Sequence, residues 1–428
     1  DIKQFIRWYY LAGTPSVNIT REWNRKEGKL KLYFKQEVAF QKNSEDDKSL
    51  VIPISISLLG NEKESEEKLF ILDKENKEFL IEGLDKSKEV PIISVFRGFS
   101  SPVNWNTDLS IGEMLYLLEN DNDAFSRWNS CQFLMRRALF DRSSGSPNIE
   151  LESSIIKSID KVLEGSKEDN LEYISLLLTI PGISELGNHQ EFIDPISLHL
   201  SCIEFQSFMG DRLSIKLWKM LDKCRSKWSA IWPSGRGERK LTENIWVLLV
   251  IAGDLKVRKE ILDIVDSSNM TLSKSALTAI SFVDCLERDK CMNIFYNKWR
   301  DNPVVLDTWF FLEASIDRPN SLDVIDELFK HSRFDLLSPN SLRALLGGFS
   351  TNTRAFHSLD GSGYDFMVEK LLEIDSRNPI TASRLVKVFS RWKNYIKQNR
   401  DLMLVAINKL NSSKLSSNTR EVVNLMIK

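Results

Sequence analysis

The stretch Ser338-Pro-Asn-Ser-Leu-Arg-Ala-Leu-Leu-Gly-Gly-Phe349, near the C-terminus, shows the helical pattern of the longer part of this chain. Ser338 suits a helix N-cap, and Pro339 suits the first helical position, where its missing N–H is not needed. Apolar residues then recur at helical spacing, namely Leu342, Leu345, Leu346 and Phe349. Gly347-Gly348 permits either close packing of this helix or its early end. The stretch predicts an amphipathic helix.

Two more helices are predicted directly after it. Asp360-Gly361-Ser362-Gly363 is turn sequence. A second apolar stripe follows the turn, made by Tyr364, Met367, Val368, Leu371 and Leu372. Asn378-Pro379 opens the third helix, whose apolar side carries Leu385, Val388 and Phe389. The polar turns are either ordinary helix punctuation or the rim of a binding surface.

The composition describes a globular chain long enough for two or three domains. It has 428 residues, 42% hydrophobic and 28% charged, with a net charge of −2. This charge gives no reason to expect nucleic acid or an anionic membrane as a partner. No apolar run approaches the roughly 18 residues that span a bilayer. Asp1-Ile-Lys-Gln-Phe5 lacks an initiator Met and a signal-peptide pattern, as expected of a piece cut from a longer chain.

The cysteines indicate a reducing compartment. There are five, at positions 131, 202, 224, 285 and 291, and no two form a C-x-x-C pair. An odd number in a large chain favours reduced, mostly buried thiols. The sequence therefore predicts a cytoplasmic protein.

From residue 16 to about residue 103 the pattern has a period of two. Leu30, Leu32 and Phe34 alternate with residues that include Lys29, Lys31 and Lys35. In the run from Ile52 to Leu58, the apolar residues alternate with Pro53, Ser55 and Ser57. Charged stretches at 42–48 and 61–67 are interpreted as solvated loops between strands. Six or seven short strands in some 90 residues predict a β-sandwich.

The rest of the chain, 104–428, is predicted to be helical. About sixteen short amphipathic helices with brief connectors favour helix pairs stacked as a solenoid. Met209-Gly210-Asp211 is expected to break a long helix that starts at Asp194. The tryptophans on these helices, such as Trp218, Trp228 and Trp246, lie either in the core or on a binding face.

The sequence contains no recognisable catalytic or metal-binding motif. Zinc peptidases usually carry H-E-x-x-H, which places two imidazoles one helical turn apart. The four histidines are His189, His199, His331 and His357; none is followed by Glu, and no two are four residues apart. We expect no catalytic residue, no metal site and no cofactor in this chain. His357 is expected to tie a turn to its neighbours.

Several short segments, in order along the whole chain, carry a family resemblance. They are Phe5…Arg7-Trp8-Tyr9…Gly13-Thr14-Pro15, Arg97…Phe99-Ser100-Ser101-Pro102-Val103, Asp123…Phe125-Ser126-Arg127-Trp128, Asn269-Met270-Thr271, Phe356-His357, Asp360-Gly-Ser-Gly-Tyr364 and Asn378-Pro379…Ala382-Ser383-Arg384-Leu385. Together they resemble the bacterial-type aminopeptidase N family, which are zinc metallopeptidases of the gluzincin type. Each segment is weak alone, and the set in order is specific.

The resemblance implies that this chain is the C-terminal half of such an enzyme. The family has an N-terminal β domain, a thermolysin-like zinc domain, an immunoglobulin-like domain and a helical C-terminal domain, and only the last two resemble this chain. Residues 1–15 would then be the trailing helix of the missing catalytic domain, 16–103 the immunoglobulin-like β-sandwich, and 104–428 the helical solenoid. The parent would be a peptide-hydrolysing enzyme with zinc held upstream, and this part would close and shape the substrate chamber.

The resemblance also implies three substrate-chamber residues. In the family, the Asn-Pro-x-x-Ala-Ser-Arg-Leu helix presents its first turn and its Arg toward the chamber. The matching positions are Asn378, Ile380 and Arg384, and this chain departs from the family at Ile380, where many members carry Gln. Arg384 would attract a peptide carboxylate or a backbone carbonyl; a structural salt bridge is the alternative.

A second function stays open at this point. A sandwich followed by a solenoid also suits a non-enzymatic module that binds a protein partner. An H-E-x-x-H motif with a third Glu ligand in the residues upstream would decide between the two.

Overall fold

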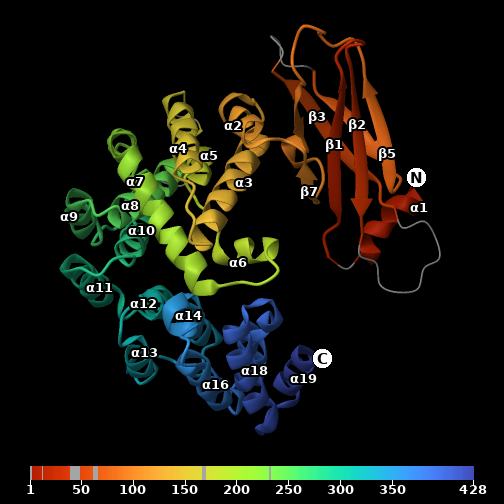
Figure 1. The fold of residues 1–428 in the computed structure, drawn as a ribbon. Helices are drawn as coiled ribbons and strands as arrows, with labels where there is room; N and C mark the ends of the chain where they lie inside the picture. The colour runs from red at the N-terminus through yellow and green to blue at the C-terminus, as the bar shows by residue number, and fades with distance from the viewer. Residues whose placement is uncertain (1, 12, 39–48, 61–65, 166–169, 231–232) are drawn as a thin grey trace. The chain divides into compact units, whose positions relative to one another are not determined.

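A computed structural model describes residues 2–11, 13–38, 49–60, 66–165, 170–230 and 233–428 (Figure 1). By its contacts the chain divides into two compact units. The first comprises Asp1–Met135 and Glu150–Gly165, and the second comprises Arg136–Ile149 and Ser166–Lys428. The predicted loop at 42–48 and most of the one at 61–67 lie outside the described residues.

The first unit contains the predicted β-sandwich, built from seven strands in the described residues. They are β1 (Ser16–Asn24), β2 (Lys29–Glu37), β3 (Ile52–Leu59), β4 (Lys68–Leu72), β5 (Asn76–Ile81), β6 (Ile92–Val95) and β7 (Asn104–Thr107). One sheet has the order β5-β2-β1-β7 and the other β4-β3-β6. All neighbours are antiparallel except β1 and β7, which run parallel.

The alternating pattern explains why these residues form a sandwich. On β2, Leu30, Leu32 and Phe34 are buried, whereas Lys29, Lys31, Tyr33 and Lys35 at the alternate positions are half-buried or exposed. The apolar side chains of both sheets meet in one core. The β7 strand extends the first sheet to Thr107, beyond residue 103, where the predicted sandwich ends.

Two of the resembling segments meet where the sandwich leads into the first helices of the same unit. The guanidinium of Arg97 is buried and lies 2.7 Å from Oδ1 of Asp121. The Ser94 hydroxyl donates to Ser126 over 3.0 Å, and the rings of Phe99 and Phe125 meet edge to face. These contacts tie the end of β6 and residues 97–99 to residues 121–126.

The N-terminal residues do not form the single trailing helix that the resemblance implies. They form α1 (Ile2–Phe5) and the 3₁₀ helix η1 (Ile6–Tyr10). Trp8 Nε1 donates to the carbonyl of Val51 over 3.0 Å, and Arg7 donates to that of Ser49 over 2.9 Å. The segment is therefore anchored on the sandwich.

The remaining elements are helical, as predicted. The α-helices are α2 (Ile111–Asn120), α3 (Ala124–Ser143), α4 (Ile149–Glu164), α5 (Leu171–Leu177), α6 (Ile183–Leu186), α7 (Pro195–Arg225), α8 (Arg236–Ile251), α9 (Leu255–Ile264), α10 (Met270–Ile280), α11 (Leu286–Trp299), α12 (Pro303–Ser315), α13 (Ser321–Phe329), α14 (Pro339–Thr351), α15 (Thr353–Phe356), α16 (Ser362–Asp375), α17 (Pro379–Leu385), α18 (Lys397–Ser412) and α19 (Ser417–Ile427). Short 3₁₀ helices are η2 (Arg97–Phe99), η4 (Gly187–His189), η5 (Val386–Phe389) and η6 (Trp392–Asn394).

Successive helices of the second unit pack on one another as in a solenoid. α8 packs against α5, α7 and α10, α12 packs against α11 and α14, and α14 packs against α17. The predicted break at Met209-Gly210-Asp211 is wrong, because α7 runs without interruption. Gly210 instead lets α8 approach, since a Cβ there would lie 2.3 Å from the carbonyl oxygen of Leu248.

The residues from Ser338 to Leu385 form the three predicted helices, α14, α16 and α17, with the short helix α15 between the first two. Ser338 caps α14 by accepting from the amide of Ser341, and Asn378 caps α17 by accepting from that of Thr381. Gly347-Gly348 does not end α14; at Gly348 a Cβ would lie 2.3 Å from the Phe311 carbonyl oxygen of α12. The apolar faces of these helices join those of α12, α18 and α19 in one core.

Candidate functional site

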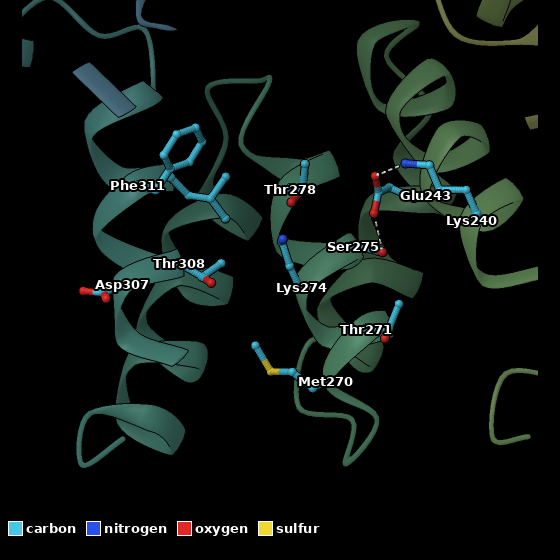
Figure 2. Close-up of a pocket in the computed structure, with 11 residues that line it drawn as sticks. Lys240, Glu243, Met270, Thr271, Lys274, Ser275, Thr278, Asp307, Thr308 and Phe311 are labelled. Atoms are coloured by element: carbon cyan, nitrogen blue, oxygen red, sulfur yellow. Dashed lines mark hydrogen bonds and ion pairs between the residues drawn. The ribbon is translucent and has the colours of Figure 1, made fainter. Parts of the chain in front are cut away.

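A groove between α8, α10 and α12 is a cavity of the helical unit (Figure 2). Its volume is about 760 Å³, within the range of small-molecule and peptide-side-chain pockets. The lining residues are Lys240, Glu243, Met270, Thr271, Lys274, Ser275, Thr278, Asp307, Thr308, Phe311 and Leu312.

The helical periodicity of α10 decides which side chains reach this groove. Asn269 caps the helix by accepting from the amides of Thr271 and Leu272. Leu272, Ala276, Leu277 and Ile280 are buried, so they hold one side of the helix in the core. Thr271, Lys274 and Thr278 recur at spacings of three and four, and they therefore share the opposite side, which lines the groove.

The charges on the α8 side of the groove are already paired. Lys240 Nζ lies 2.9 Å from Oε1 of Glu243, and the Ser275 hydroxyl donates to Oε2 over 2.6 Å. Both carboxylate oxygens of Glu243 thus have a donor, and the ammonium of Lys240 balances the charge. Lys274 is exposed and makes no ion pair or hydrogen bond with the described residues.

The α12 wall has both polar and apolar side chains, namely Asp307, Thr308, Phe311 and Leu312. Figure 2 shows Thr308 and Phe311 on the side of α12 that faces Lys274, whereas Asp307 points away from it. Burial raises the pKa of Asp307, and a hydrogen bond with Ser341 opposes this effect. Phe311 is 36% exposed, so part of its ring is available to a ligand.

The three residues expected in the substrate chamber lie on α17, which α14 separates from α12. The Asn378 side chain caps the helix and is half-buried. Ile380 is 59% exposed, and Arg384, one turn later, is also exposed. Arg384 makes no ion pair with any residue that the structure describes, so the salt bridge considered as its alternative is not formed there. The chamber role of these residues stays a prediction.

His357 lies in a buried polar cluster. Its Nδ1 is 2.7 Å from the Tyr364 hydroxyl, and Asn399 Nδ2 donates to that hydroxyl over 3.1 Å and to the His357 carbonyl over 3.2 Å. Burial lowers the pKa of His357 to about 3. The neutral imidazole joins α15, α16 and α18, which is a tie of the kind that the sequence predicts.

The structure describes no group of three or more His, Cys, Asp or Glu side chains that could hold a metal ion within the ranges given above. His189, His199 and His331 are separate from His357; His331, for example, packs its ring against Trp309 and Phe310. Among the described residues, these histidines do not provide a zinc site.

The groove between α8, α10 and α12 was not identified from the sequence. Its helices are not consecutive, since α9 and α11 lie between them in the chain, and no motif marks their contact. One signal was available: Thr271, Lys274 and Thr278 form a polar stripe opposite the apolar residues of a helix that begins within Asn269-Met270-Thr271, one of the resembling segments.

The fold and its two parts define a class of protein, an immunoglobulin-like sandwich followed by helical repeats. Residues 112–428 match the family described as "Domain of unknown function (DUF3458_C) ARM repeats", and residues 13–108 match "Domain of unknown function (DUF3458) Ig-like fold". The chain belongs to this family, and the predicted fold class is confirmed. Within the described residues, no helix is both long and apolar enough to cross a membrane.

The chain is also similar to proteins named "Aminopeptidase N". It is 28% identical to that of Caulobacter vibrioides over 99% of this chain and 49% of the relative, and 27% identical to that of Escherichia coli over 96% and 48%. The chain thus spans about half the length of the curated relatives it matches. A crystal structure of Legionella pneumophila aminopeptidase A in complex with aspartic acid matches with a TM-score of 0.87 and 25% identity, over 100% of this chain and 50% of that one. The resemblance to the aminopeptidase N family is confirmed.

Proposed function

We propose that this chain is the C-terminal half of a zinc-dependent aminopeptidase N, which removes N-terminal residues from peptides. The observation that carries the proposal is the similarity to proteins named "Aminopeptidase N" over 96–99% of the chain. Zinc and the general base belong to an upstream half with an H-E-x-x-H motif. The helical unit closes and shapes the substrate chamber, and Asn378, Ile380 and Arg384 contact the peptide there.

The proposal extends to the partners and the compartment. The chain meets the upstream catalytic domain of its own polypeptide and peptide substrates, and neither nucleic acid nor a membrane. Residues 1–15 trail from that catalytic domain, and 16–103 and 104–428 act as its two supporting domains. Burial raises the pKa of the Cys202 and Cys291 thiols to about 12, which keeps them protonated and unreactive, as suits the cytoplasm.

The test uses a polypeptide that includes the upstream coding region. We expect it to release the reporter group from an aminoacyl substrate, to lose this activity on treatment with a zinc chelator, and to recover it with added zinc. The 428-residue chain alone is the control, and we expect it to release nothing. A longer polypeptide that is folded and zinc-loaded but inactive on every N-terminal residue would contradict the proposal.

A further inference from the structure

Two lysines and two carboxylates line the groove between α8, α10 and α12, and among the described residues Lys274 is the lysine there without an ion pair. The carboxylate of Asp307 points away from it (Figure 2). Lys240 and Glu243 neutralise each other at 2.9 Å, and Ser275 takes the second oxygen of Glu243. Lys274 stands between these groups and α12 with no ion pair to any described residue. A single ammonium is a point charge that matches a group with one negative charge, such as a carboxylate.

The walls around Lys274 require further properties of a ligand besides its negative charge. Met270 and Phe311 present apolar surface, and the hydroxyls of Thr278 and Thr308 provide hydrogen-bond donors and acceptors (Figure 2). A ligand that satisfies this groove therefore carries a carboxylate directly beside an apolar group. The C-terminal residue of a peptide with an apolar side chain has this chemistry, because its carboxylate and its side chain share one carbon atom.

We propose that this groove binds the C-terminal carboxylate of a peptide, with Lys274 pairing with the carboxylate and Phe311 contacting the last side chain. The identification of the ligand as a peptide rests on the proposed aminopeptidase function. The assignment adds a second peptide contact to the helical unit, on α10 and α12, separate from Arg384 on α17.

Direct binding tests this proposal without any hydrolysis. The 428-residue chain is titrated against a tetrapeptide that ends in Leu and carries an N-terminal fluorophore, as the free acid and as the C-terminal amide, with anisotropy as the readout. We expect the free acid to bind at least about tenfold more tightly, the ratio that one hydrogen bond to a charged group supplies. An amide whose last residue is Asp distinguishes a side-chain carboxylate, and we expect it to bind like the Leu amide.

Two matched variants place the effect on the groove. Lys274→Met removes the charge and keeps the side-chain length, and we expect it to abolish the preference for the free acid. Lys290→Met, at an exposed position on α11, removes a charge outside the groove, and we expect it to preserve the preference. Thermal melting checks that both variants are folded.

Equal affinity for the acid and the amide, no measurable binding of either, or a preference that survives Lys274→Met would overturn the inference. The outcome is independent of the enzymatic test. If the binding test fails but the longer polypeptide is active, the carboxylate site is wrong and the proposed aminopeptidase function stands. If the free acid is preferred in a Lys274-dependent way but the longer polypeptide is inactive, the carboxylate site is supported and the proposed function is wrong.

Discussion

At the scale of single residues, His357 shows how burial converts a titratable group into a pH-dependent stability term. Its pKa in the folded chain is about 3, below the roughly 6.5 of an unfolded chain. As the pH falls below about 6.5, the unfolded chain gains a proton that the folded chain does not. The free energy of unfolding therefore decreases, by up to about 1.4 kcal/mol per pH unit, until about pH 3.

We expect His357→Gln to weaken this pH dependence. Urea unfolding at pH 7.5 and pH 5.5 gives the difference in unfolding free energy for each protein. The difference should be larger in the unmodified chain than in His357→Gln, whatever the stability of the variant at pH 7.5. His189→Gln, at an exposed position, is the control and should retain most of the difference. Equal differences for the unmodified chain and His357→Gln would show that this histidine is not the group involved.

Arg384 is the residue on which the proposed chamber role depends. Its side chain is exposed and makes no ion pair among the described residues, so its removal should cost little stability. In the longer polypeptide, Arg384→Ala should lower kcat/KM for short peptides. The corresponding loss of transition-state stabilisation should be roughly 1–3 kcal/mol, the scale of a hydrogen bond to a charged group. Lys387→Ala, another exposed basic residue nearby, should leave kcat/KM unchanged. A variant with normal kinetics and a lowered melting temperature would assign Arg384 a structural role instead.

At the scale of elements, helix starts were predictable and close helix contacts were not. Ser338, Asn378 and Asp194 cap helices because each side chain accepts a hydrogen bond from the amide three residues later. This is a local effect that the sequence displays. The sequence around Gly210 predicts a break that α7 does not have, because this glycine is needed for the close approach of another helix, α8. The groove at Lys274 escaped notice for the same reason, since three helices separated in sequence form it.

The neighbouring glycines Gly347 and Gly348 on α14 allow the effect of helix propensity on stability to be measured separately from the effect of helix packing. At Gly348 a Cβ would lie 2.3 Å from the backbone oxygen of Phe311, whereas at Gly347 nothing lies within 4 Å. Gly348→Ala should therefore lower the free energy of unfolding by roughly 1–3 kcal/mol through overpacking. Gly347→Ala should raise it by roughly 0.5–1 kcal/mol, because alanine favours the helix. Denaturant unfolding of both variants tests this, and equal effects would contradict the packing of α14 on α12.

At the scale of the whole molecule, the resemblance was recoverable from sequence because its segments are local and ordered. Arg97 and Asp123 illustrate this: the segments that contain them meet at the end of the sandwich. The order of the strands in each sheet and the parallel pairing of β7 with β1 depend on residues far apart in the chain. No local sequence segment indicates them. The division at residues 15 and 103 stays a prediction, because by its contacts the chain groups the sandwich with the first helices.

The N-terminal segment gives a prediction about the larger molecule. Tyr9 and Tyr10 are 82% and 72% exposed, and Ile2 and Phe5 beside them are 78% and 52% exposed. The segment is nevertheless fixed to the sandwich through Trp8 and Arg7. Such an anchored apolar face suits a partner surface, and the proposed function identifies that partner as the upstream half of the same polypeptide.

The double substitution Tyr9→Ser with Tyr10→Ser tests this assignment through stability in two contexts. In the 428-residue chain we expect a change within about 0.5 kcal/mol, as for exposed positions in general. In the longer polypeptide we expect a lower melting temperature, because the same substitutions would remove apolar contacts with the upstream half. Trp8→Ala should destabilise both forms, since its indole binds the sandwich in each. If the double variant has equally small effects in the two contexts, the upstream half does not cover this face.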